Sequence, residues 1–310
     1  MNTPKNAIVV AVGADGVDSA LVFAFDEARR TECPVHLVHV LQLPAGEAYA
    51  GVYDGAMDNA KAILANALDQ ATELAAGEVP VTGEIVGTGW VVGDLARRTG
   101  DVSLLVVQHR ALGRVHRIFA GSVAKSVAGR ARVPVVSVPA GWTQDSTRPP
   151  VVTAGVQDPV EAPALLRVAF EEARARKAAL VVLHAWWLAS GDDAVVVDPA
   201  FSYEWSGRSR HEIEPVLEPL QREFPFVDVS VTVRHAPPVK AILDATATSD
   251  LVVLGRRHHL LPLGSHLGPV ARGVLAHSAC PVMITPEPRV GTATDRDVEQ
   301  RPAGLGTSGG

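Results

Sequence analysis

Cysteine is scarce in this chain, and long apolar runs are missing. Cys33 and Cys280 are the only two cysteines among 310 residues, and they lie far apart in the sequence. They therefore provide neither a disulfide framework nor a four-cysteine metal site, and a reducing cytoplasm suits them best. No apolar run approaches the about 20 residues of a membrane-spanning helix. The N-terminal residues enter an apolar stretch without the pattern of a signal peptide.

The charge balance also disfavours one class of partner. A formal net charge of −6 disfavours broad binding to nucleic acid. The remaining composition, with 47% hydrophobic and 20% charged residues, is typical of globular proteins. We therefore expect a cytoplasmic protein with no membrane and no nucleic-acid partner. Its length predicts two domains of about 150 residues each.

The chain contains an internal duplication. Residues 102–139 align without a gap on residues 249–286, so that each position pairs with one 147 residues later. The coinciding residues include Val106 and Val253, Arg110 and Arg257, Gly121 and Gly268, and Pro134 and Pro281. A repeat of this length indicates two copies of one structural unit.

Each copy alternates continuous apolar runs with amphipathic stretches, which predicts parallel strands buried on both faces and joined by helices. We expect strands near 7–13, 35–41, 82–87, 103–108 and 134–138, and again near 151–156, 179–185, 227–234, 250–255 and 281–285. We expect helices near 18–32, 55–77, 91–99 and 121–130, and again near 160–176, 207–222, 238–247 and 268–277. The fold class is thus α/β, with two tandem doubly wound domains.

The domain limits follow from composition. Residues 1–140 form the first predicted domain and residues 151–287 the second. Residues 141–150 are polar and end in two prolines, which suits a linker. The polar, glycine-rich residues 288–310 are predicted to be a disordered tail.

Several segments resemble the universal stress protein family. They are VVAVGADGVDSALVFAFDEA near the start, LHAWW in the second half, and the closing units GSVAKSVAGRARVPVVSV and GPVARGVLAHSACPVMIT. The resemblance covers both halves and implies a tandem member, in which each domain has a five-stranded parallel sheet of order 3-2-1-4-5 with helices on both faces. In the family the fifth strands pair across a dimer, and here residues 133–138 and 281–285 are expected to pair within one chain. The domains then form an intramolecular pair, and a homodimer is the alternative.

The resemblance also implies a place for a nucleotide. In the ATP-binding branch of the family, the fourth strand runs into Gly-x-x-Gly, then nine residues, then Gly-Ser or Gly-Thr, and an Asp ends the first strand. Glycines let the backbone approach the ligand, and the amides at a helix N-terminus attract phosphate. The four motif positions are Gln108, Ala111, Gly121 and Ser122 in the first half, and Gly255, His258, Gly268 and Pro269 in the second.

Each half thus keeps two of the four motif residues. The positions of the first-strand Asp are taken by Gly13 and Gln157. The residues left to contact an adenine nucleotide are Gly121, Ser122, Val123, Gly255 and Gly268. ATP is therefore expected to bind weakly or not at all. Gly121 and Ser122 either contact phosphate or only cap a helix.

Other chemistry finds little support in the sequence. A Walker lysine, a dinucleotide-binding glycine motif, a zinc-hydrolase motif and a nucleophile elbow are all missing. His258, His259 and His266 have no carboxylate or cysteine beside them, so no metal site is predicted. Trp186 and Trp187 either face a ligand or pack. We therefore expect a non-enzymatic stress-response or regulatory protein, with no catalytic residue. The alternative is a functional ATP-binding member, such as a slow ATPase.

Overall fold

The structure is a computed structural model, and it describes residues 3–14, 16–41, 50–87, 102–109, 125–187, 199–256 and 267–286. The first half contains β1 (Ile8–Val12), α1 (Asp18–Thr31), β2 (Val35–Val40), α2 (Ala50–Ala75), β3 (Val81–Val86), β4 (Leu104–His109) and β5 (Val135–Pro139). The second half contains β6 (Val151–Val156), α5 (Pro163–Arg176), β7 (Ala179–Trp186), α6 (Pro199–Glu223), β8 (Val229–His235), α7 (Pro238–Thr246), β9 (Leu251–Gly255), α8 (Pro269–His277) and β10 (Val282–Thr285).

All ten predicted strands are present, each with ends within two residues of the prediction. The two long helices begin earlier than predicted, α2 at Ala50 and α6 at Pro199. Gly55 and Gly207 lie inside these helices, although glycine disfavours a helix interior. The predicted helix 91–99 and the tail 288–310 lie outside the described residues. Of the predicted helix 121–130, residues 125–130 are described; residues 125–128 are helical and residues 129–130 form a turn.

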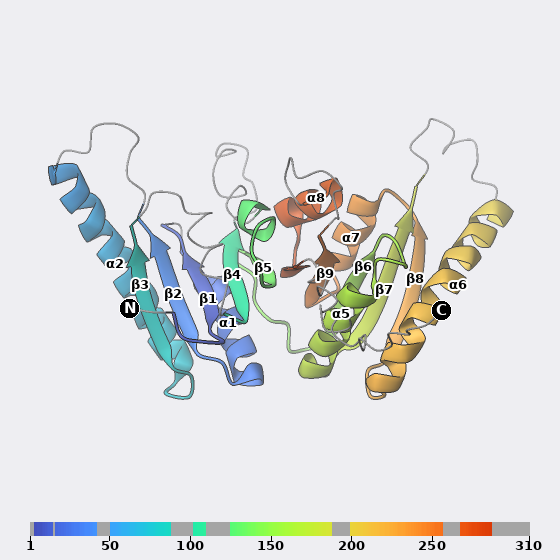
Figure 1. Cartoon of the computed structure of the whole chain (residues 1–310), viewed down its shortest axis with the longest axis horizontal. Helices are drawn as coiled ribbons and strands as arrows, with labels where there is room; N and C mark the ends of the chain where they lie inside the picture. Colours follow the sequence, from blue (N-terminus) through green and yellow to red (C-terminus); the bar gives the residue numbers. More distant parts are fainter. Residues whose placement is uncertain are drawn as a thin grey trace, which may run out of the picture.

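The strands form one ten-stranded sheet in the order β3-β2-β1-β4-β5-β10-β9-β6-β7-β8. Read within each half, this is the order 3-2-1-4-5, and all pairs inside a half are parallel. Figure 1 shows the two halves side by side, with α2 and α6 at the outer ends. The predicted α/β class and strand order are confirmed.

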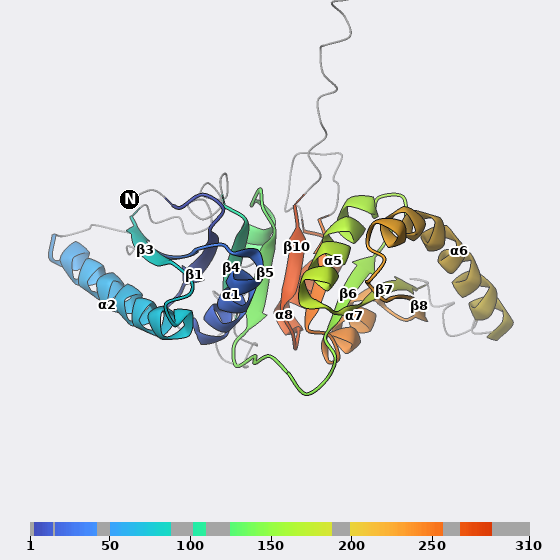
Figure 2. The ribbon, with the colours of Figure 1, turned by 90° about the horizontal axis from the view of Figure 1, so that it is seen from below.

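The halves meet through their fifth strands, as expected from the resemblance. Strand β10 pairs antiparallel with β5, and Met283 lies opposite Val136 at the centre of the pair. The pairing satisfies the backbone groups of two edges that would otherwise be open to other chains. Figure 2 shows β5 and β10 adjacent in the middle of the molecule.

Helices cover both faces of the sheet. Helices α1, α2, α5 and α6 share one hydrophobic core, which runs through both halves and contains the fully buried Phe25 and Phe170. Helices α7 and α8 pack on the opposite face with residues 127–131. Because the strands carry apolar residues toward both cores, their sequences read as continuous apolar runs.

Residues 140–150 are attached to both halves. The ring of Trp142 lies 6.1 Å from that of Phe23 in α1. Arg148 donates two hydrogen bonds to the Asp250 carboxylate, at 3.0 and 3.1 Å. The segment that joins the two family-like halves is thus held in place by both of them.

Candidate functional site

A cavity of about 470 Å³ lies where strands β6, β7 and β9 end. Strand β6 pairs with β7 on one side and β9 on the other, so the connections depart in opposite directions at this point. In doubly wound sheets such a switch point is where ligands bind. We call this cavity the second-domain crevice. Its described lining comprises Gly155, Val156, Gln157, Asp158, Glu161, Ala162, Leu165, Leu183, His184, Ala185, Trp186, Trp187, Pro238, Ile242, Leu254, Gly255, Arg256, Gly268, Pro269, Val270 and Ala271.

Most of this lining is apolar, and two indole rings close one side. Trp186 is 8% exposed, and its ring stacks on that of His235 at 4.0 Å between centroids. Trp187 is 45% exposed, and its ring lies 5.6 Å from the same histidine. The sequence left open whether these tryptophans pack or face a ligand. In the structure Trp186 is packed, whereas much of the Trp187 surface is exposed at the crevice.

Three described charged residues line the crevice. Asp158 and Glu161 are exposed and lie on the segment that follows β6. The Asp158 Oδ1 atom accepts a hydrogen bond from the Val160 amide at 2.9 Å. Arg256 donates from Nη2 to the backbone oxygen of Ala131 in the first half, at 2.5 Å. Arg256 is thereby oriented toward the other half.

The N-terminus of α8 also borders the crevice. Gly268 is its N-cap residue, with an extended backbone (φ −64°, ψ 164°), and no side chain caps the helix. Pro269 occupies the first helical position, where its fixed φ suits the helix but its nitrogen carries no hydrogen. This helix start therefore offers one amide donor fewer than usual to an anion.

Gly255 and Gly268 both line the crevice, so the structure brings together the two second-half residues expected to contact a nucleotide. Gly255 leaves space, because an added Cβ would lie 3.9 Å from Leu165 Cδ2 and 4.0 Å from Thr285 Oγ1. Gln157, at the position expected for Asp, also lines the crevice. The first-half candidates Gly121, Ser122 and Val123, together with His258, His259 and His266, lie outside the described residues.

The first half places a side chain where the second half has Gly255. Gln108, on β4, accepts a hydrogen bond at Oε1 from the backbone amide of Ala20, at 3.1 Å. Ala20 lies in the first turn of α1, whose N-cap residue Val17 makes no side-chain cap. Gln108 therefore caps this helix from a neighbouring strand. Sequence reasoning identified Gln108 as a lost glycine and missed this bond, since it joins residues 88 positions apart.

Two histidines at equivalent strand ends have a structural role. His39 Nδ1 lies 2.9 Å from the oxygen of Val12, and His184 Nδ1 lies 3.1 Å from the oxygen of Val156. In each half the second strand is thus tied to the end of the first. The repeated bond is a structural feature that the two halves share.

His109, which the sequence did not single out, is a buried titratable group between the halves. It is 2% exposed, and its Nδ1 lies 2.8 Å from Ser137 Oγ on β5. Burial, followed by the charge of Lys125 and then that of His277 on α8, lowers its pKa to about 4. The imidazole is therefore neutral at physiological pH. Its equivalent in the second half is Arg256, so the duplicated position differs in charge.

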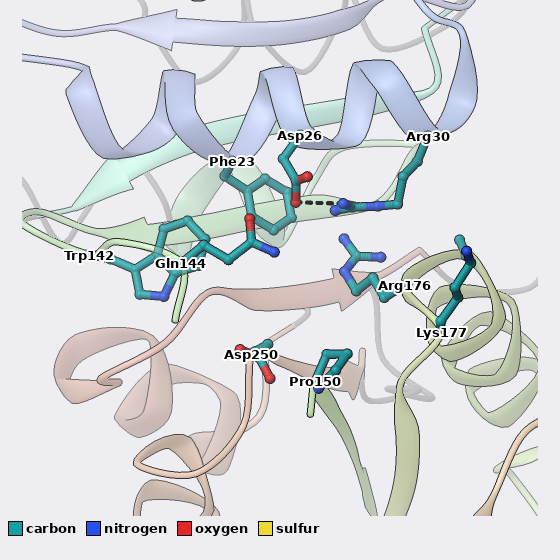
Figure 3. Close-up of a pocket in the computed structure, with 10 residues that line it drawn as sticks. Phe23, Asp26, Arg30, Trp142, Gln144, Pro150, Arg176, Lys177 and Asp250 are labelled. Atoms are coloured by element: carbon teal, nitrogen blue, oxygen red, sulfur yellow. Dashed lines mark ion pairs between the residues drawn. The ribbon is translucent and has the colours of Figure 1, made fainter. Parts of the chain in front are cut away.

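A cluster of charged side chains fills the contact between α1 and α5, beside a small cavity of about 130 Å³. Figure 3 shows Arg30 and Arg176 from the two halves facing each other there. Arg176 forms ion pairs with Glu27, at 2.5 Å, and with Glu172. Burial raises the pKa of Glu172, and Glu27 adds to that effect while Arg176 opposes it. Most of these charges are paired with one another, although the buried Arg30 Nε atom has no hydrogen-bond partner.

The described residues contain no group of three or more His, Cys, Asp or Glu that could hold a metal ion. Among the described helices, none has the length and apolarity needed to cross a membrane. Cys33 and Cys280 are free thiols.

Comparison with known proteins gives consistent matches. The model of the Universal stress protein family matches residues 6–139 and again 151–286. A universal stress protein of Mycolicibacterium smegmatis is 29% identical over 290 residues, which cover 89% of this chain and 96% of that protein. One of Mycobacterium tuberculosis is 29% identical over 217 residues, 67% of this chain and 66% of its own length. Among solved structures, a universal stress protein of Archaeoglobus fulgidus superimposes with a TM-score of 0.66 at 16% identity, covering 92% of this chain and 97% of that one.

Proposed function

Because the chain belongs to the universal stress protein family, we propose that it is a non-enzymatic stress-response protein of the regulatory type, in which ATP binding is weak or lost. The two halves act as one unit, since they share a continuous sheet and a hydrophobic core on each of its faces. We expect it to work in the cytoplasm as an intramolecular domain pair, and its free thiols are consistent with a reducing compartment.

Pro269 is the observation that supports weak ATP binding most directly. In the second-domain crevice it removes an amide from the helix start that would meet a phosphate. The family's hydroxyl at this position is missing as well. Two lost charge-assisted donors correspond to about 3–6 kcal/mol, at about 1.5–3 kcal/mol each. Gln157 supplies no carboxylate for the adenosine part, and the neighbouring Asp158 would need a rearranged turn to replace it.

In the first half, Gln108 opposes binding in a different way. A glycine in its place would let a ligand approach the strand end, whereas the Gln108 side chain stands there and is bonded to Ala20. Gly13 supplies no carboxylate. Any residual affinity for ATP is expected at Gly121 and Ser122.

Nucleotide co-purification tests the proposal. The full chain is purified without added nucleotide and denatured, and the released small molecules are identified by absorbance and mass spectrometry. We expect no adenine nucleotide in stoichiometric amount. One or two nucleotides per chain, or release of ADP from added ATP at a steady rate, would show a functional ATP-binding protein or ATPase instead.

A gain-of-function variant tests the same reasoning in the first half. The triple substitution Gly13→Asp, Gln108→Gly and Ala111→Gly restores the family's residues and should raise ATP affinity at least tenfold, which corresponds to about 1.4 kcal/mol. In the triple variant the Ser122 hydroxyl is expected to bond a phosphate of ATP. Adding Ser122→Ala removes that hydroxyl and should therefore reverse much of the gain in affinity. If the triple variant melts cooperatively but binds no better than the natural chain, Ser122 only caps a helix.

A further inference from the structure

We propose that the second-domain crevice binds a small organic cation, namely a ligand with a flat apolar body and a positively charged amine. This inference rests on the proposed function, because it assigns a different ligand to the crevice in which ATP binding is weak or lost. It names the chemistry of a site that is open, has a suitable size and lies at the switch point of the sheet.

The crevice is suited to an apolar body. Its volume of about 470 Å³ falls within the about 300–1,000 Å³ typical of small-molecule sites. Leu165, Leu183, Ile242 and Leu254 line it, and each of the four is buried. A flat ring system seated against them would remove its own apolar surface from water, which is the dominant favourable contribution to such binding.

The side formed by the ends of β6 and β7 is suited to a positive charge. Trp187 offers an indole that is 45% exposed, and an ammonium group placed over an aromatic face is attracted by the ring quadrupole. Asp158 and Glu161 come from the segment after β6, the strand next to β7 in the sheet. Aromatic rings together with carboxylates are the groups that recognise organic ammonium ions.

The opposite side of the crevice offers few positive charges or amide donors to an anionic ligand. Arg256 is the one basic Lys or Arg side chain among the described lining residues, and its guanidinium donates to the Ala131 oxygen of the first half. The helix start beside it lacks the Pro269 amide. The described lining therefore carries two carboxylates against one guanidinium that is oriented elsewhere.

Three ligands with one ring system and different charge test the inference by isothermal titration calorimetry on the full chain. They are 2-(2-naphthyl)ethylamine, which is cationic, 2-(2-naphthyl)ethanol, which is neutral, and 2-naphthylacetate, which is anionic. We expect the amine to bind at least tenfold more tightly than the acetate, with the alcohol between them. Equal affinities, or preference for the acetate, would overturn the inference.

Variants locate the binding site. Asp158→Asn should lower the affinity for the amine about threefold and leave the affinity for the alcohol unchanged. The substitution removes one exposed negative charge and keeps the shape of the side chain. Asp54→Asn, which changes another exposed carboxylate, on α2 of the other half, is the matched control and should have no effect. Trp187→Leu should weaken the amine more than the alcohol. Unchanged affinity for the amine in both crevice variants would contradict the inference.

A filled crevice provides a further check. Gly255→Gln places in the second half the side chain that the first half has at Gln108, and it should abolish binding of all three ligands. Thermal melting checks that this variant folds, and the two surface variants keep the inference testable if it does not. For the natural chain, tight binding of ATP that displaces the amine would contradict the proposed function. If the natural chain binds neither ATP nor the amine, only this inference is contradicted.

Discussion

Replacing Arg176 by methionine tests whether the buried charge cluster holds the two halves together. The Arg176 and Glu27 side chains are each 7% exposed, and Glu172 is 16% exposed. Without the Arg176 guanidinium, two carboxylates from equivalent positions of the two halves, in AFDEAR and AFEEAR, would keep Arg30 as their remaining cation, and Arg30 pairs with Glu27 at 3.4 Å. Removing one partner of a buried ion pair costs about 3–5 kcal/mol, so we expect a loss of that size in the free energy of unfolding near neutral pH.

The loss should depend on pH in a defined direction. Burial raises the pKa of Glu172, and Arg176 is the main group opposing that shift. In Arg176→Met the pKa of this carboxyl should therefore rise further. A carboxyl whose pKa is higher in the folded state stabilises the fold below its unfolded pKa, and this contribution is lost as the pH rises through the folded pKa. The deficit relative to the natural chain should thus be largest at neutral pH and smaller in acid.

Urea unfolding followed by circular dichroism, at about pH 7.5 and about pH 5, measures both effects. Arg167→Met is the matched control, because Arg167 lies on the same helix and pairs with Glu223 at the surface. Exposed pairs contribute little, so the control should lose much less stability. A loss below about 1 kcal/mol for Arg176→Met, or a loss that does not change with pH, would refute the reasoning.

Three further changes are predicted, each read out by urea unfolding. Gln108→Ala should lower the free energy of unfolding by about 1 kcal/mol, since it leaves the first turn of α1 without its cap; no loss would mean that water replaces the bond. The depressed pKa of His109, about 4 against an ordinary 6.5, means that the unfolded chain takes up this proton first as the pH falls. Stability should therefore decrease by up to about 1.4 kcal/mol per pH unit between pH 6.5 and about 4, and His109→Gln should reduce that slope. Glu32→Gly should raise the free energy of unfolding by about 1 kcal/mol, because Glu32 ends α1 in the left-handed region at φ 55°, which glycine adopts without steric cost. A loss of stability would show that contacts of the Glu32 side chain contribute more than the relief of backbone strain.

Most of the fold could be predicted from the sequence, because short local patterns of apolar residues mark the strands and helices, and each pattern occurs in both halves. The apolar runs at 151–156 and 7–13 mark buried strands, and the duplication fixes the boundaries of one half by those of the other. The early start of α6 could not be predicted, since Gly207 lies within the helix and packing of its later turns outweighs the local preference.

The candidate site was predictable only in part. The motif spacing identified Gly255 and Gly268, which meet at one cavity because parallel strands end at the same edge of a sheet. The bond from Ala20 to Gln108 and the ion pair of Glu27 with Arg176 depend on residues 88 and 149 positions apart. Such contacts depend on how whole helices and strands pack against one another, so no short sequence pattern predicts them.

Calorimetric titration of ATP into the purified full chain tests the central claim most directly. Wild-type protein should give no heat beyond dilution with up to about 1 mM nucleotide, which corresponds to a binding free energy weaker than about −4.1 kcal/mol. A low-micromolar dissociation constant with two sites per chain would contradict the claim.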